Sequence, residues 1–146
     1  MLDHYLLLQR YFYIYPTIKD FLNSSVQEYR QNNRVTTLFG RIRNFDNIVQ
    51  TARDMRFGER AAMNMPLQGT ASDIIKLAML RVDEKITQKN LKAKLILQIH
   101  DELIFDVPEE EVDEVVQIVR ECMENVVKLL VPLTVEIGVG NSWYDI

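Results

Sequence analysis

Two adjacent carboxylates, Asp101 and Glu102, stand between two apolar segments of the sequence. Residues 95–99 and 103–107 both favour β-strands, so the carboxylates and His100 are predicted to form the polar tip of a hairpin. Adjacent carboxylates repel each other and favour a neighbouring cation, and Mg²⁺ uses few protein carboxylates while leaving positions for substrate phosphates. A polar turn without a metal explains the same residues, so both interpretations stay open. His100 is likewise either a general base or metal ligand, or plain polar surface.

A second polar group is spaced by four residues and consists of Arg60, Asn64 and Gln68. On a helix this spacing places the three side chains in one stripe. Such a row suits contacts with a phosphate backbone, sugars and base edges, although most helices also present a polar stripe to solvent. Pro66 lies within the row, so the spacing holds only if the helix continues through it.

Charge is distributed unevenly along the 146 residues, whose formal net charge is −4. Residues 1–60 contain nine Lys/Arg and six Asp/Glu, whereas residues 61–146 contain eight and fifteen. The basic residues between positions 30 and 60 are all arginines: Arg30, Arg34, Arg41, Arg43, Arg53, Arg56 and Arg60. Arginine suits bidentate phosphate contacts, and a local basic patch can bind a polyanion despite a negative total. A solvated, salt-bridged surface is the alternative interpretation.

The first part of the chain predicts two helices and a small hairpin. Residues 6–15 are apolar and aromatic, and Pro16 predicts a break because the residue before proline avoids helical geometry. Apolar residues recur at helical spacing over 17–30. Residues 34–39 favour a strand that turns at Gly40 and pairs back through 41–43.

The second part predicts a long helix from Arg53 to about Asn90, interrupted by Pro66 and Gly69. After the carboxylate hairpin, Glu109 to Glu111 begin another helix. Residues 133–139 alternate as a final strand. These elements predict an α+β fold in which helices cover a small antiparallel sheet. The length predicts a single domain, 1–146.

The cysteine content and the N-terminal residues indicate the cellular compartment in which the protein is expected. Cys122 is the one cysteine, which excludes an internal disulfide and a zinc site of several cysteines. The first residues lack a basic n-region and a cleavage site of secretory type, and no apolar run approaches the roughly 20 residues of a membrane-spanning helix. We therefore expect a cytoplasmic protein with no membrane partner.

Two extended motifs resemble those of the family A DNA polymerases. Residues 98–103, Q-I-H-D-E-L, are similar to Q-[VI]-H-D-E-[LV]. Residues 59–73 are similar to E-R-x-A-x-N-x-P-x-Q-G-T-A-A-D, with Ser72 at the second alanine of the final A-A-D. Shorter matches are T-L-F-G-R at 37–41, the Y-F-x-x-[YF]-P pattern ending at Pro16, and Trp143. The resemblance spans essentially the whole chain.

The resemblance implies roles for the polar residues. Asp101 resembles one of two palm aspartates that bind catalytic Mg²⁺, and Glu102 resembles the accessory carboxylate near the primer terminus. His100 resembles a residue touching the primer backbone. Three further residues match positions that contact primer–template DNA, including its minor groove: Arg60, Asn64 and Gln68. The minor groove is chemically degenerate, which suits an enzyme that must accept every sequence.

Two family motifs have no counterpart in this sequence: the D-Y-S-Q-I-E-like motif with the other metal-binding aspartate, and the fingers pattern R-x-x-x-K-x-x-x-F-G-x-x-Y. After Gly40, only part of the family's basic run remains, which weakens a phosphate role for Arg43. Two-metal phosphoryl transfer needs both metals. The sequence thus carries half the Mg²⁺ ligands, and dNTP binding requires the N-terminal part with those motifs.

The resemblance therefore implies the C-terminal palm portion of a DNA-directed DNA polymerase of replication or repair. Residues 1–50 would form a helical lead-in near the fingers, and 53–146 the palm. We expect the isolated chain to be inactive. The alternatives are a non-catalytic module that binds primer–template DNA and a structural remnant. Helices without their usual neighbours expose apolar faces, so we also expect self-association.

Overall fold

The computed structural model describes residues 2–45 and 52–145, with side chains from residue 6 to 45 and from 55 to 145. The chain divides into two compact units, Met1–Thr70 and Ala71–Ile146. Both units combine helices with a two-stranded antiparallel sheet, so the α+β prediction is confirmed. No helix in these described ranges is both long and apolar enough to cross a membrane. The assignment of 53–146 to one palm domain stays a prediction.

The first unit begins with two helices separated at the predicted break. Helix α1 spans Leu2–Ile14 and α2 spans Pro16–Asn32. Pro16 is the first residue of α2. An N–H at this position would have no partner within the helix, so proline costs no hydrogen bond here. The next residue, Asn33, caps the C-terminal end of α2: it has a left-handed φ of 54° and donates its N–H to Tyr29 O at 2.8 Å.

A short hairpin follows α2, as predicted. Strands β1 (Arg34–Thr36) and β2 (Ile42–Asn44) pair antiparallel, and Gly40 provides the turn with a φ of 83°. Five residues form the buried core beside the hairpin: Tyr29, Val35, Phe45, Ala62 and Met65. The rings of Tyr29 and Phe45 meet edge to face, with centroids 5.0 Å apart. The core thus joins α2 and the hairpin to the first half of α3 (Ala52–Gln88).

The predicted interruption of α3 is wrong, because 52–88 form one helix with Pro66 inside it. Proline removes the hydrogen bond of its own nitrogen, and its ring crowds the carbonyl four residues earlier, at a cost of roughly 3 kcal/mol. Packing outweighs that loss, since Ala62, Met65 and Gly69 are buried on both sides of the proline. Thr70 Oγ1 also donates to Pro66 O.

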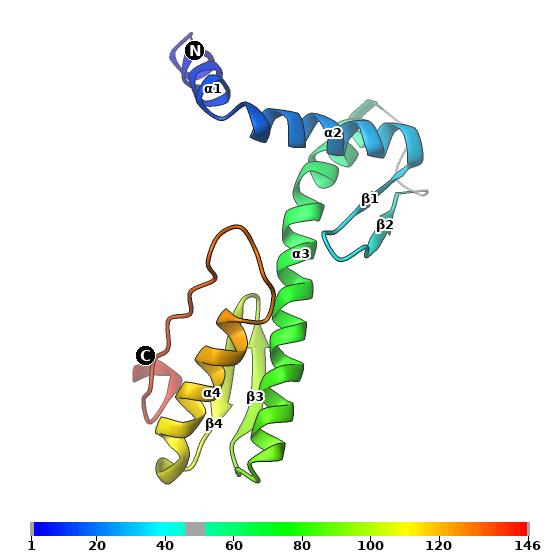
Figure 1. Ribbon diagram of the computed structural model, residues 1–146. Helices are drawn as coiled ribbons and strands as arrows, with labels where there is room; N and C mark the ends of the chain where they lie inside the picture. The colour runs from blue at the N-terminus through cyan, green and yellow to red at the C-terminus, as the bar shows by residue number, and fades with distance from the viewer. Residues whose placement is uncertain (1, 46–51, 146) are drawn as a thin grey trace. The chain divides into compact units, whose positions relative to one another are not determined.

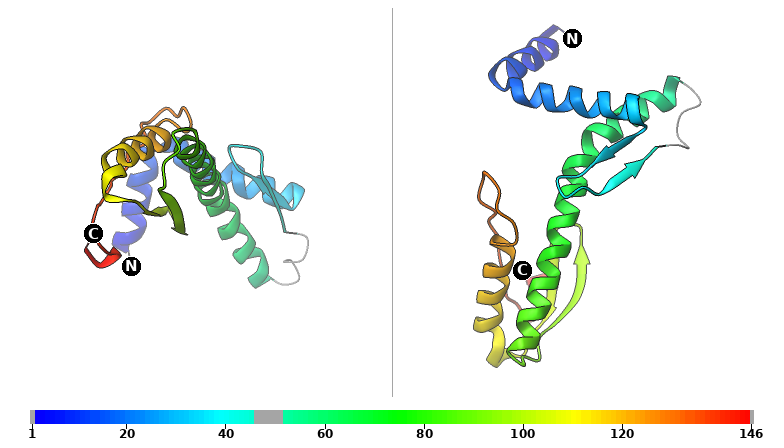
Figure 2. Two further views of the ribbon diagram at one scale, coloured as in Figure 1. Left: turned by 90° about the horizontal axis from the view of Figure 1, so that it is seen from below. Right: turned by 45° about the vertical axis from the view of Figure 1, so that its right-hand side comes forward.

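The second unit contains the second half of α3, a hairpin and a covering helix. Strands β3 (Lys94–Ile99) and β4 (Glu102–Asp106) pair antiparallel, and the short η1 (Glu109–Glu111) leads into α4 (Val112–Glu124). In Figures 1 and 2, α4 runs beside the second half of α3. The core between these elements is Val82, Ile86, Ala93, Val115, Ile118, Val119 and Cys122. Partly buried Phe105 and Val107 pack against it, which attaches the hairpin to the helices.

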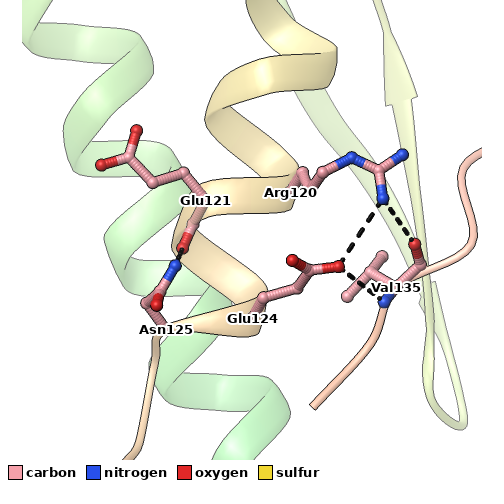
Figure 3. A network of polar contacts seen from close by, with 5 residues as sticks. All are labelled: Arg120, Glu121, Glu124, Asn125 and Val135. Carbon is pink, nitrogen blue, oxygen red and sulfur yellow. Dashed lines mark hydrogen bonds and ion pairs between the residues drawn. The ribbon is translucent and has the colours of Figure 1, made fainter. Parts of the chain in front are cut away.

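The predicted strand at 133–139 is wrong, although its alternation is real. Leu133, Val135 and Ile137 are partly buried while the residues between them are exposed. The backbone of Val135 bonds to helix side chains: its N–H donates to Glu124 Oε1, and its oxygen accepts from Arg120 Nη1, both at 3.1 Å (Figure 3). Arg120 and Glu124 also pair with each other at 3.6 Å. Side chains of α4 thus replace a neighbouring strand here. The final short helix, η2, spans Trp143–Asp145.

Apolar side chains are exposed on the first two helices, as expected. Tyr13 is 88% exposed and Leu7 65%. Other exposed residues on or between these helices are Leu6, Leu8, Tyr11, Ile14, Tyr15, Ile18 and Phe21. Self-association through these faces stays a prediction.

Gly58 in α3 generates a stability prediction. A Cβ at this position would overlap Tyr29 Oη and Cζ in the buried core. Gly58→Ala should therefore lower the free energy of unfolding by about 1–3 kcal/mol, even though alanine normally gains about 0.5–1 kcal/mol inside a helix. Urea denaturation followed by circular dichroism measures the change. A more stable variant would contradict the packing described here.

Candidate functional site

The tip of the β3–β4 hairpin presents the predicted carboxylates. Ile99 pairs with Glu102, so the connection is the dipeptide His100-Asp101, and Glu102 is the first residue of β4 rather than part of the turn. His100, Asp101 and Glu102 are all exposed. These three residues thus lie accessible to solvent at one end of the β3–β4 ladder.

The turn itself has an unusual backbone. His100 has a φ of 52°, in the left-handed region that non-glycine residues adopt at a cost of roughly 1–2 kcal/mol. The side chain of Gln98 donates from Nε2 to His100 O at 2.8 Å. Sequence reasoning did not assign Gln98 a role, since a polar residue in an exposed strand position gives no signal by itself.

The base of the hairpin is bound to Glu111, the last residue of η1. The Glu111 carboxylate accepts hydrogen bonds from Lys92 N–H at 2.8 Å and from Ala93 N–H at 3.0 Å, just before β3 begins. A charged acceptor strengthens such bonds. A register shift between Leu95 and Leu97 marks a bulge in β3, and bulges increase the local twist of a strand. The hairpin is therefore anchored at its base, with the acidic tip at its far end.

The donor set at the tip fits part of a magnesium site. Carboxylate oxygens are the ligands Mg²⁺ prefers, and it is usually held by one or two of them together with substrate phosphates. Asp101 and Glu102 supply such oxygens, and both are accessible. Within 2–45 and 52–145, no cluster of three or more His, Cys, Asp or Glu side chains could hold a metal. The described chain thus supplies a partial ligand set.

Cys122 does not contribute to this site. It is buried in the core of the second unit, and this burial raises the pKa of its thiol above the ordinary value. A raised pKa keeps the sulfur protonated and unreactive. Cys122 is therefore a core residue of the second unit.

The polar stripe lies on the exposed face of α3. Arg60, Asn64 and Gln68 are exposed, and the buried residues Ala62 and Met65 lie between them in sequence. Because α3 continues through Pro66, the predicted spacing holds. None of the three side chains has a hydrogen bond or ion pair with any part of the chain that the structure describes. Their DNA-binding role stays a prediction.

The T-L-F-G-R motif at 37–41 and the extended motif at 59–73 contact each other, which spacing did not reveal. Leu38 N–H donates to Thr70 Oγ1 at 3.0 Å, and Arg41 Nη2 donates to Gly69 O at 2.8 Å. A Cβ on Gly69 would lie 2.6 Å from Thr37 Cγ2, so only glycine allows this approach. The T-L-F-G-R turn is thus fastened to the helix that carries the stripe.

The arginine-rich stretch is partly structural. Arg30 Nε donates to Glu59 Oε1 at 2.9 Å, Arg41 bonds Gly69 O, and the Arg43 guanidinium lies 5.4 Å from the Phe45 ring centroid. Three others are exposed: Arg34, Arg56 and Arg60. The side chain of Arg53 is outside the described residues. The salt-bridged interpretation therefore describes one part of the stretch, and exposed positive charge remains on another.

Comparison with known proteins identifies the class. The sequence model of DNA polymerase family A matches residues 5–145. The chain therefore belongs to DNA polymerase family A.

Individual relatives agree with this family. The chain is 48% identical over 139 residues to DNA polymerase I of Caldicellulosiruptor bescii and 45% identical over 139 residues to that of Bacillus subtilis. Each alignment covers 94% of this chain and 16% of the relative. The POL domain of Pol1 from M. smegmatis, solved with DNA primer-template and dNTP, matches with a TM-score of 0.90 and 39% identity. That match covers 97% of this chain and 25% of the solved chain.

Thr70 generates a prediction about the hairpin docking. Thr70→Val keeps the shape of the side chain but removes the acceptor of Leu38 N–H. We expect a loss of about 1 kcal/mol in the free energy of unfolding and faster hydrogen exchange at the Leu38 amide. Thr70→Ser keeps the hydroxyl and should preserve the slow exchange. Wild-type exchange at Leu38 in Thr70→Val would show that the hydroxyl does not hold the turn.

Proposed function

We propose that this chain forms the C-terminal palm portion of a DNA-directed DNA polymerase and supplies one part of its nucleotidyl-transfer site. The observation that carries the proposal is the β3–β4 hairpin, which presents Asp101 in a two-residue connection directly before Glu102. In a member of DNA polymerase family A, an accessible carboxylate pair at a fixed tip suits metal and phosphate chemistry.

Asp101 would hold Mg²⁺ through its carboxylate oxygens, and Glu102 would be an accessory carboxylate near the primer terminus. When bound, the ion would stabilise the negative charge that develops on a transferring phosphoryl group. The chain contributes the orientation of the ligands, because the ladder and the Glu111 anchor restrict the movement of the hairpin. His100, beside Asp101 and equally exposed, would contact the primer backbone.

The exposed stripe on α3 would contact primer–template DNA. Arg60 offers a guanidinium for phosphates, and the amides of Asn64 and Gln68 both donate and accept hydrogen bonds. Amide groups suit the minor groove, whose pattern differs little among sequences. Support comes from the related POL domain, which was solved with DNA primer-template and dNTP.

The chain spans 16% of the length of the curated relatives described above. It lacks sequences similar to the upstream aspartate motif and the fingers motif. We therefore assign to it a share of the metal ligands and of the DNA contacts, and assign dNTP binding to the complete polymerase.

The isolated chain should not extend a primer. One carboxylate pair provides too few ligands for the two metals that nucleotidyl transfer needs. Incubation of the purified chain with primed template, Mg²⁺ and dNTPs should leave the primer at its original length. A preparation from a host without its own DNA polymerase I removes the main contaminant. Extension by such a sample would contradict the assignment of a partial site.

The isolated chain should bind primer–template DNA weakly, with an affinity that falls as salt rises, because phosphate contacts release counterions. Arg60→Ala should weaken binding and reduce the slope of log affinity against log salt by about 1. Fluorescence anisotropy at several salt concentrations measures both effects.

Lys19→Ala is the matched control, because it removes one exposed positive charge from α2 rather than from the stripe. It should leave the salt dependence unchanged. Absence of binding at low salt would contradict a DNA-binding surface and would favour a structural remnant. Equal effects of the two variants would assign binding to general charge rather than to the stripe.

A further inference from the structure

Gln98 contacts the turn that carries Asp101 although it lies outside that turn. Its Nε2 donates to His100 O, two residues further along the chain, at 2.8 Å. We propose that Gln98 is a positioning residue that holds the His100–Asp101 peptide in place and thereby orients the Asp101 carboxylate. The consequence for metal binding rests on the function proposed above, whereas the effect on the turn does not.

The geometry of a peptide unit links this bond to Asp101. The carbonyl of His100 and the N–H of Asp101 belong to one planar group. A hydrogen bond that fixes the carbonyl therefore fixes the plane from which the Asp101 Cα and side chain continue. Gln98 thus acts one peptide away from the carboxylate.

The turn needs such a hold because its backbone is strained. The φ of 52° at His100 is unfavourable for a residue with a Cβ, and strained residues persist where their surroundings determine them. Among residues 2–45 and 52–145, Gln98 makes the one side-chain hydrogen bond to the backbone of His100 or Asp101. The Ile99–Glu102 pair closes the ladder but leaves the orientation of the peptide between them free to change.

Two variants of the full chain test the role of Gln98. Gln98→Ala removes the donor, and Gln98→Glu replaces it with an oxygen that cannot donate when ionised. Gln117→Glu is the matched control, since Gln117 is exposed on α4 and its side chain makes no hydrogen bond within the described residues. It introduces the same charge away from the hairpin.

The conformation of the turn is read by NMR. A positive φ brings the amide hydrogen and Hα of one residue close together, so wild-type His100 should give a strong cross-peak between them. Both Gln98 variants should weaken this cross-peak, and Gln117→Glu should keep it. The cross-peaks between Ile99 and Glu102 report whether each variant keeps its ladder.

Metal binding is read with Mn²⁺ alone, which accepts the same oxygen ligands as Mg²⁺. Titration should broaden the signals of Asp101 in the wild type. The loss of one hydrogen bond should weaken this apparent affinity about threefold to tenfold in the Gln98 variants. The control should match the wild type.

The outcomes separate the two proposals. Loss of the His100 cross-peak with weaker Mn²⁺ binding supports both. Loss of the cross-peak in a chain whose wild type shows no Mn²⁺ effect at Asp101 supports the positioning role and contradicts the metal role. An unchanged His100 cross-peak in Gln98→Ala overturns the positioning role, regardless of the result of the Mn²⁺ titration. Loss of the ladder in both variants also overturns it, because Gln98 would then support folding rather than orient the turn.

Discussion

A connection of two residues joins β3 to β4, and this short connection is the constraint on which the proposed chemistry depends. It requires His100 to adopt a positive φ and places Asp101 and Glu102 at one accessible end of the ladder. Surrounding interactions then fix the hairpin: Phe105 packs on the core between α3 and α4, and Glu111 binds the backbone before β3. Without these supports, two neighbouring carboxylates would be a mobile polar turn.

The first unit uses the residues of its motifs for two different purposes. Gly69 and Thr70 hold the turn at Leu38, so their identity is explained by packing and hydrogen bonding. Arg60, Asn64 and Gln68 on the same helix remain exposed. A motif of this kind therefore combines structural residues with candidate DNA contacts, and the structure separates the two sets.

Local patterns predicted the features that depend on local interactions. The two apolar, strand-forming segments on either side of His100 and Asp101 predicted the hairpin, and the spacing of four predicted the stripe on α3. Features that depend on distant contacts, or on the exact shape of a turn, were not predictable. Pro66 remains inside a helix because tertiary packing outweighs one lost bond. The alternation at 133–139 suggested a strand, but Arg120 and Glu124 take the place of the neighbour that a strand requires. The bond from Gln98 to His100 depends on a turn whose shape the sequence does not reveal.

The most direct measurement is primer extension by a chimera of Bacillus subtilis DNA polymerase I in which the matching segment is replaced by this chain. We expect Mg²⁺-dependent extension, and a rate at least about 100-fold lower with Asp101→Ala, since a metal supplies several kcal/mol of charge stabilisation. Asp113→Ala, which removes an exposed carboxylate from α4, should retain the rate. An active chimera whose extension rate is unchanged by Asp101→Ala would contradict the central claim that this hairpin supplies a catalytic metal ligand.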